Sequence, residues 1–229
     1  MSLTDAEWQA LTLSLTVALR SVAMSLPLAV LVAWLLTRAQ FPGRSLFDAF
    51  VHLPLVLPPV VVGYLLLILL GTRGPIGGWL NRTFGIQLVF TTNGAAVATA
   101  VMSFPLIVRA IRIALENVDR GLEEAARTLG AGPIDRFLTI TLPLMTPGIL
   151  AGAVTAFAAG LGEFGAVITF VSNIPGETRT LPLALYTAIQ TPGGDAAAAR
   201  LAALSFSLGL FGLLVSEWLS RRLRRLLGR

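Results

Sequence analysis

The side chains that carry most enzyme chemistry are nearly absent from this sequence. All 17 basic residues are arginine, there is no lysine or cysteine, and the single histidine is His52. The common phosphate-binding loop needs a lysine that reaches the β- and γ-phosphates, so we expect no ATP hydrolysis by this route. The usual zinc sites and thiol nucleophiles also need residues that are missing. We therefore expect no catalytic residue, metal or cofactor in this chain, and we interpret His52 as a structural hydrogen-bonding residue.

One polar segment, residues 116–143, carries charges in a pattern typical of a short capped helix. Asp119 can cap its start, and Glu123 lies early, where the helix dipole favours anions. Glu123 and Arg127 are spaced for an ion pair between residues i and i+4. Gly130 can end the helix in the left-handed conformation.

This predicted helix presents a small and charged surface, formed by Glu124, Ala125 and Ala126. Pro133 prevents the helix from continuing. A helix of this kind is suited to docking into another protein. The alternative is a solvated connecting loop with an ordinary cap, and the residue pattern alone leaves both interpretations open.

A second group of polar residues, Thr178, Arg179 and Thr180, could form a cationic, hydroxyl-lined mouth that receives an anion. The alternative is an arginine that contacts a partner protein or its own backbone. Arg20 lies within a long apolar stretch, and we interpret it as a side chain that reaches the lipid headgroups.

The composition indicates that these residues are positioned by membrane-spanning helices. Hydrophobic residues make up 55% of the chain and charged residues 13%, with a mean hydropathy of +0.80. Soluble domains carry about 25% charged residues. A spanning helix needs about 20 mostly apolar residues. Five stretches meet this requirement, at residues 11–36, 50–70, 94–115, 146–171 and 197–219.

We therefore predict an all-α fold, a polytopic transmembrane bundle of about five spans that forms one domain over residues 1–229. The first stretch has neither a basic segment before it nor a small-residue cleavage site after it, so we expect a retained span. Pro27 and Pro105 are expected to interrupt the first and third spans. Residues 181–189 are too short to cross and are expected to form a surface or re-entrant helix.

The arginines gather on one side of these expected spans. Twelve fall there, namely Arg38, Arg44, Arg109, Arg112, Arg120, Arg127, Arg136, Arg221, Arg222, Arg224, Arg225 and Arg229. Because cytoplasmic loops collect basic residues, we expect the N-terminus outside and the C-terminus in the cytoplasm. The basic tail is then an orientation signal and a lipid contact, not a nucleic-acid patch.

Glu163 lies within the fourth expected span, where an ionised side chain costs about 2.5–3.5 kcal/mol. We expect it to accept hydrogen bonds at a helix break between Gly162 and Gly165, or to bridge two copies of the chain, in a structural gating role. Direct contact with a substrate is the alternative. Pro58 and Pro59, which interrupt the second span, are further candidates for a translocation path or gate.

The polar segment resembles, in full, the signature of ABC importer permeases. It contains Glu124-Ala125-Ala126, Gly130 after three residues, Ile140 after nine more, and then Leu142-Pro143. The resemblance implies a type I importer permease fold in which this segment, Glu123 included, forms a coupling helix. In that family the coupling helix sits in a cleft of a separate ATP-binding subunit.

Three further stretches resemble the molybdate permeases, namely LPLVLPPVVVGYLLL (53–67), LGEFGAVITFVSNIPGETRTLP (161–182) and YTAIQTPGGD (186–195). This resemblance implies import of molybdate, or of a similar oxyanion such as tungstate, across the bacterial inner membrane. The implied complex is a homodimer of this chain, two ATPase subunits that hold ATP and Mg, and an extracytoplasmic oxyanion-binding protein.

Two other functions are alternatives. Sulfate and thiosulfate permeases share the proline-rich second span, but resemble this chain less after the fourth span and are usually longer. An ATP-independent transporter or channel would suit proline-broken helices, but would not need the complete coupling signature.

Overall fold

The computed structural model describes residues 3–226, so Arg229 of the basic tail lies outside it. Within this range the chain forms helices and no strands, which confirms the predicted all-α class. In chain order the helices are α1 (Asp5–Arg38), α2 (Arg44–His52), η1 (Leu53–Leu55), α3 (Pro59–Leu70), α4 (Pro75–Phe84), α5 (Thr92–Glu116), α6 (Arg120–Thr128), α7 (Pro133–Arg136), η2 (Phe137–Thr141), α8 (Leu142–Leu161), α9 (Gly165–Val171), α10 (Leu181–Gln190) and α11 (Asp195–Leu226).

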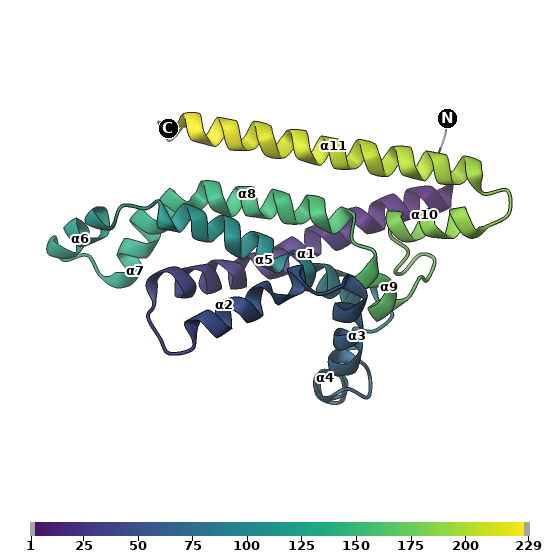
Figure 1. Cartoon of the computed structure of the whole chain (residues 1–229), viewed down its shortest axis with the longest axis horizontal. Coiled ribbons are helices and arrows are strands. Elements are labelled where there is room, and N and C mark those ends of the chain that lie inside the picture. Colours follow the sequence, from purple (N-terminus) through teal and green to yellow (C-terminus); the bar gives the residue numbers. More distant parts are fainter. Residues whose placement is uncertain (1–2, 227–229) are drawn as a thin grey trace.

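The long helices run side by side along the longest axis, as Figure 1 shows. Helices α1, α5 and α8 enclose the main core, and α11 packs on α8 and α10. Short α6 and α7 lie at one end of this bundle, while α10 and the start of α1 lie at the other end (Figure 1). The core is made of small and aliphatic side chains, including Ala29, Ala33, Leu36, Ile107, Ile111, Leu115 and Met145.

Glycines of α8 allow its close approach to α5. A Cβ atom on Gly148 would collide with the Cβ of Ala114, and one on Gly152 would lie 3.1 Å from the Cβ of Ala110. Lipid does not drive apolar helices together, so small residues that permit close van der Waals contact favour association. The glycine-rich fourth span is therefore a packing surface inside one chain.

Four helical segments in the described part of the chain are long and apolar enough to cross a membrane. They are Asp5–Arg38, Thr92–Glu116, Pro133–Leu161 and Asp195–Val215. The expected ranges 11–36 and 94–115 lie within the first two. The expected range 146–171 spans a break, because α8 ends at Leu161 and α9 begins at Gly165.

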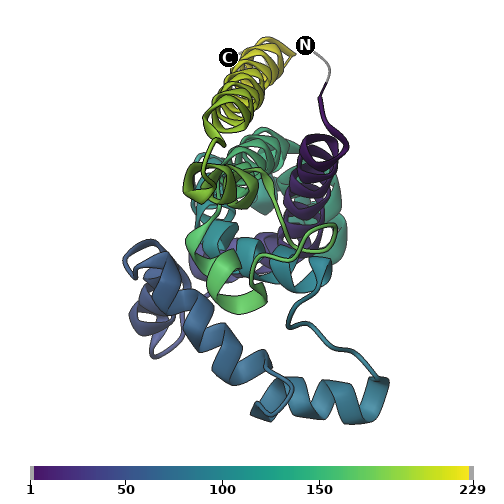
Figure 2. The same ribbon diagram turned by 90° about the vertical axis from the view of Figure 1, so that its right-hand side faces the viewer.

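The second expected span is a sharply bent pair of helices. The chain bends by 111° between residues 44–55 and residues 59–70, and the pair counts either as a fifth span or as a re-entrant loop. Pro58 is extended, with ψ 135°, and Pro59 begins α3 without a backbone N–H to donate backwards. As a result α3 and α4 project from the bundle on the side away from α11 (Figures 1 and 2).

The expectation that Pro27 and Pro105 interrupt their spans is wrong. Pro27 lies inside the continuous α1 and Pro105 inside the continuous α5, so neither interrupts its helix. Proline is tolerated within membrane helices where neighbouring groups satisfy the freed backbone carbonyl. Residues 181–190 form the short helix α10, whose Leu181 and Leu183 are buried.

Candidate functional site

The helix of the signature segment is α6, and both of its ends are built as the sequence predicted. The carboxylate of Asp119 accepts a hydrogen bond from the N–H of Gly121 at 2.8 Å. Gly130 has φ +88°, and the N–H of Ala131 donates to the carbonyl of Ala126 at 3.0 Å. This glycine-terminated cap turns the chain sharply after one short helix.

The outer face of α6 consists of small, acidic and apolar groups. Glu124 and Ala125 are exposed, and Ala126 is half-buried. Leu129, which was not predicted as a site residue, is 88% exposed. Its position directly before the helix-ending Gly130 is the sequence feature that could have identified it. An exposed leucine beside two alanines makes this face suitable for close contact with a partner.

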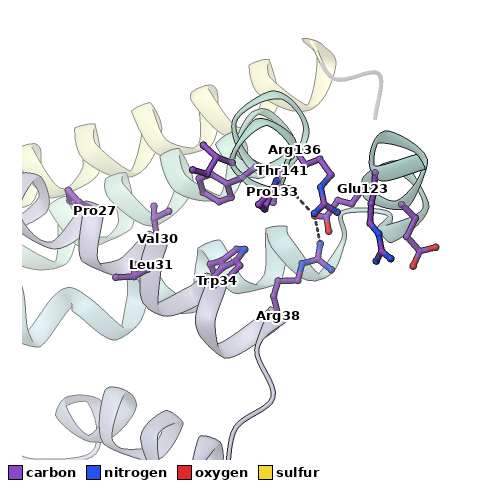
Figure 3. Close-up of a pocket in the computed structure, with 13 residues that line it drawn as sticks. Pro27, Val30, Leu31, Trp34, Arg38, Glu123, Pro133, Arg136 and Thr141 are labelled. Atoms are coloured by element: carbon purple, nitrogen blue, oxygen red, sulfur yellow. Dashed lines mark hydrogen bonds and ion pairs between the residues drawn. The ribbon is translucent and has the colours of Figure 1, made fainter. Parts of the chain in front are cut away.

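Glu123 does not form the predicted ion pair with Arg127. Instead its Oε1 atom accepts a hydrogen bond from Nη2 of Arg38 at 3.0 Å and another from the hydroxyl of Thr141 at 2.8 Å (Figure 3). Arg127 is exposed. The helix spacing permits either partner, but packing of the end of α1 against this segment places a guanidinium group closer to the carboxylate. Glu123 therefore joins three elements, α1, α6 and η2.

The remaining signature residues lie where the chain enters α8. Ile140 belongs to η2, a π-helical turn in which the N–H of Leu142 donates to the carbonyl of Phe137. Leu142 is half-buried against the main core, and Pro143 is exposed. The signature segment is thus anchored in the core at the start of α8 while its α6 face is exposed.

A second charged cluster, not predicted from the sequence, links α2 to α5 at the same end of the bundle. Asp48 forms an ion pair with Arg112 at 2.8 Å, and Arg112 pairs with Glu116 at 3.1 Å. The ring of His52 contacts the carbonyl of Asp48 at 2.9 Å, so the structural role expected of His52 is confirmed. The spacing of Asp48 and His52, four residues apart in one helix, could have indicated their contact from the sequence. No sequence pattern indicates the pair of Asp48 and Arg112, which lie 64 residues apart.

The break between α8 and α9 carries Glu163, just beyond the end of the apolar segment Pro133–Leu161. Gly162 caps the end of α8, and Oε1 of Glu163 accepts a hydrogen bond from the N–H of Ala166 at 2.9 Å. A Cβ atom on Gly165 would lie 2.8 Å from the Cβ of Pro59, so α9 packs closely on α3. The structure brings Glu163, Gly165 and Pro59 to one helix crossing, beside the bend at Pro58.

The loop that follows α9 uses its polar residues to fix its own shape. The fully buried hydroxyl of Thr178 accepts from the N–H of Ile174 at 2.9 Å and donates to the carbonyl of Ser172 at 3.1 Å. Nε of Arg179 donates to Oδ1 of Asn173 at 2.9 Å. Thr180, also buried, precedes α10. These contacts give Thr178 a structural role, and a role of Arg179 toward an anion stays a prediction.

Arg20 and the start of α1 also have specific partners. Nη1 of Arg20 donates to Oδ1 of Asn93 at 2.8 Å, so this side chain links α1 to α5 rather than only reaching outward as expected. Glu7 is buried and forms an ion pair with Arg200 of α11 at 2.8 Å. The Glu7–Arg200 pair lies at the end of the bundle opposite α6, whereas Arg20 lies near the middle of α1 (Figure 1).

Residues 25–225 match the family described as "Binding-protein-dependent transport system inner membrane component". The chain belongs to this family of inner-membrane permeases. It is 62% identical, over the whole length of both chains, to the Molybdenum transport system permease protein ModB of Escherichia coli (strain K12). It is 40% identical to the Sulfate transport system permease protein CysT of the same organism, over 87% of this chain and 72% of that protein.

Solved structures agree with this fold. A bacterial alginate ABC transporter, crystallised with an alginate pentasaccharide-bound periplasmic protein, superposes with a TM-score of 0.76 at 19% identity. The superposition covers 96% of this permease and 80% of that chain. At this identity the likeness shows the fold alone, and it confirms the predicted ABC importer permease architecture.

Proposed function

We propose that this permease moves molybdate, or a similar oxyanion such as tungstate, into the cytoplasm as part of an ATP-driven importer. The observation that carries the proposal is the full-length identity of 62% to a protein named for molybdenum transport. The sulfate permease is more distant, at 40% identity over part of its length. Sulfate or thiosulfate therefore remains the second candidate substrate.

In this proposal ATP hydrolysis belongs to a separate subunit that docks on α6 from the cytoplasm. The exposed Glu124, Ala125 and Leu129 supply a docking face, and Gly130 fixes its direction. ATP and Mg are held by that subunit, and this chain binds no cofactor. Purified permease without its partner is expected to show no nucleotide turnover above a detergent blank.

The permease is also proposed to act as a homodimer that receives its anion from an extracytoplasmic binding protein. Helix α3 supports the first part, because it projects from the bundle with a stripe of exposed apolar side chains. Val60, Tyr64 and Ile68 follow one another at intervals of four residues and are 54%, 55% and 48% exposed. A second copy packed on α3 would cover this stripe.

The orientation proposed is N-terminus outside and C-terminus in the cytoplasm. Arg38, Arg112 and Arg136 all lie at the α6 end of the bundle, which supports this orientation under the positive-inside rule. A reporter fused after Arg229 should be active only if it functions in the cytoplasm, and one placed before Trp8 only if it functions outside. Reporters that place both ends on one side would refute the orientation.

The decisive experiment reconstitutes the permease with its ATPase and binding protein and measures uptake of labelled molybdate, tungstate and sulfate. We expect ATP-dependent uptake of molybdate and tungstate, with little uptake of sulfate. A preference for sulfate would support the second candidate. Uptake that persists without ATP would instead support a secondary transporter or channel.

A further inference from the structure

A groove of about 720 Å³ opens between α1 and the segment that contains α6, α7 and η2 (Figure 3). One part of its wall is apolar and comes mainly from α1, with Pro27, Val30, Leu31 and Trp34. The other part is charged and includes Arg38, Glu123, Glu124, Arg127 and Arg136. The groove is therefore divided into an apolar part and a charged part.

The two parts lie at different depths along α1. The apolar helix Asp5–Arg38 is long enough to span the membrane, and Arg38 is its last residue. Pro27 and Arg38 are separated by about 16 Å of helix rise. The apolar wall thus faces the level of the lipid chains, and the charged part lies at the level of the headgroups. Trp34, between them, is placed where tryptophan is enriched in membrane proteins.

The charged part has positive charge available for a ligand. Arg38 is paired with Glu123 at 3.0 Å. In the part of the chain that the structure describes, neither Arg127 nor Arg136 forms an ion pair, and Nε of Arg136 donates only to the carbonyl of Gly132 at 3.4 Å. Glu124 lines the same wall without an ion pair to any described residue, so three arginines and two glutamates leave one net positive charge for the anionic group of a ligand.

We propose that this groove binds an anionic phospholipid from the bilayer leaflet on the α6 side. Its phosphate contacts Arg127 and Arg136, and one acyl chain lies along Val30, Leu31 and Trp34. The groove volume falls within the range of about 300–1,000 Å³ common for ligand sites. Basic pockets between membrane helices bind anionic headgroups by the same combination of charge and apolar contact. This site does not depend on which anion the permease transports.

Other occupants match the groove less well. A free oxyanion would use the arginines, but it would leave the apolar wall of α1 without a partner. A soluble protein that docks on α6 would meet the charged part, but it would not extend to Pro27, about 16 Å further along α1. A phospholipid covers both parts. It also ties the end of α1 to α7, so lipid composition would influence the segment that meets the ATPase.

Lipid binding can be measured on the full-length permease purified with its ATPase, by native mass spectrometry during titration with phosphatidylglycerol or phosphatidylcholine. We expect preferential binding of phosphatidylglycerol. In the double variant Arg127→Gln/Arg136→Gln this affinity should fall about thirtyfold, since each arginine near a membrane surface contributes about fivefold. Arg109→Gln is the matched control, because Arg109 is exposed at the same end but lines a different groove. The affinity of Arg109→Gln for phosphatidylglycerol should be unchanged.

A second pair of variants tests the apolar wall without changing charge. Leu31→Asn should lower the affinity for phosphatidylglycerol several-fold, while Leu28→Asn, equally exposed on α1 but outside this groove, should not. Equal binding of phosphatidylcholine and phosphatidylglycerol would overturn the proposal. Displacement of the lipid by molybdate or inorganic phosphate would overturn it too, because the site would then be a simple anion site.

Discussion

Arg38, the last residue of α1, and Glu123, in the first turn of α6, form an ion pair of 3.0 Å although they lie 85 residues apart in the sequence. The side chains are only 12% and 23% exposed. The same carboxylate oxygen of Glu123 accepts from Thr141 at 2.8 Å, so displacement of α6 is transmitted to both α1 and η2.

The first prediction concerns Glu123 as a positioning residue. Glu123→Ala should lower the stability of the detergent-solubilised permease by about 1–3 kcal/mol, because charged hydrogen bonds to two partners are lost. It should also lower transport per ATP hydrolysed in the assembled complex. Unfolding curves together with the ratio of uptake to ATPase rate measure both effects.

Glu124→Ala is the matched comparison for this prediction. Glu124 is exposed and has no such contacts, so its removal should weaken docking of the ATPase and leave stability within about 0.5 kcal/mol. If the two substitutions changed stability equally, the ion pair with Arg38 would not hold α6. If both variants transported at the parental rate with normal assembly, α6 would be only a loop.

The contrast between Glu123 and Gly130 shows what sequence patterns can predict here. The caps at Asp119 and Gly130 depend on residues within a few positions, so their types and spacing were sufficient. The partner of Glu123 is set by how α1 packs, and no local pattern encodes a contact across 85 residues. The Asp48–Arg112 pair was missed for the same reason.

The sequence predicted the break at Pro58 and Pro59 correctly, but the breaks it predicted at Pro27 and Pro105 are absent from α1 and α5. Pro58 and Pro59 break the second span because two successive prolines with an extended Pro58 exclude a continuous helix, but they do not encode the 111° angle. Pro27 and Pro105 lie in continuous helices, where packing of α1 against α5 decides the outcome. Helix propensity alone was therefore a good guide at the double proline and a poor one at single prolines.

The second prediction tests the left-handed turn after α6. Gly130 has φ +88°, a conformation that costs a β-branched residue at least about 1–2 kcal/mol. Gly130→Val should therefore misdirect the end of α6 and reduce transport and ATPase assembly. Gly132→Ala is the control, because Gly132 has φ −68° and open space around its Cβ position. Equal loss in both variants would show that the segment tolerates no change of any kind.

The third prediction tests the packing of α8 on α5. Gly148→Ala places a methyl group against the Cβ of Ala114, and overpacking of this type costs about 1–3 kcal/mol. We expect a lower melting temperature and less folded protein after purification. Gly209→Ala on α11 has open space and should be neutral or slightly stabilising. Identical melting temperatures for the two variants would contradict the close α5–α8 contact.

The last prediction separates a structural from a charge-dependent role of Glu163. Its Oε1 atom accepts from the N–H of Ala166 at the start of α9, as an N-terminal capping side chain does. Glu163→Ala removes this acceptor and should destabilise the crossing of α9 and α3 by about 1 kcal/mol, with reduced transport. Glu163→Gln keeps a carbonyl oxygen in the same place, so we expect it to restore most of the stability and transport. Uptake assays and unfolding curves on the two variants measure this. If Glu163→Gln is stable but transports as poorly as Glu163→Ala, the negative charge itself is needed, and the hydrogen bond to Ala166 does not account for the role of Glu163 in transport.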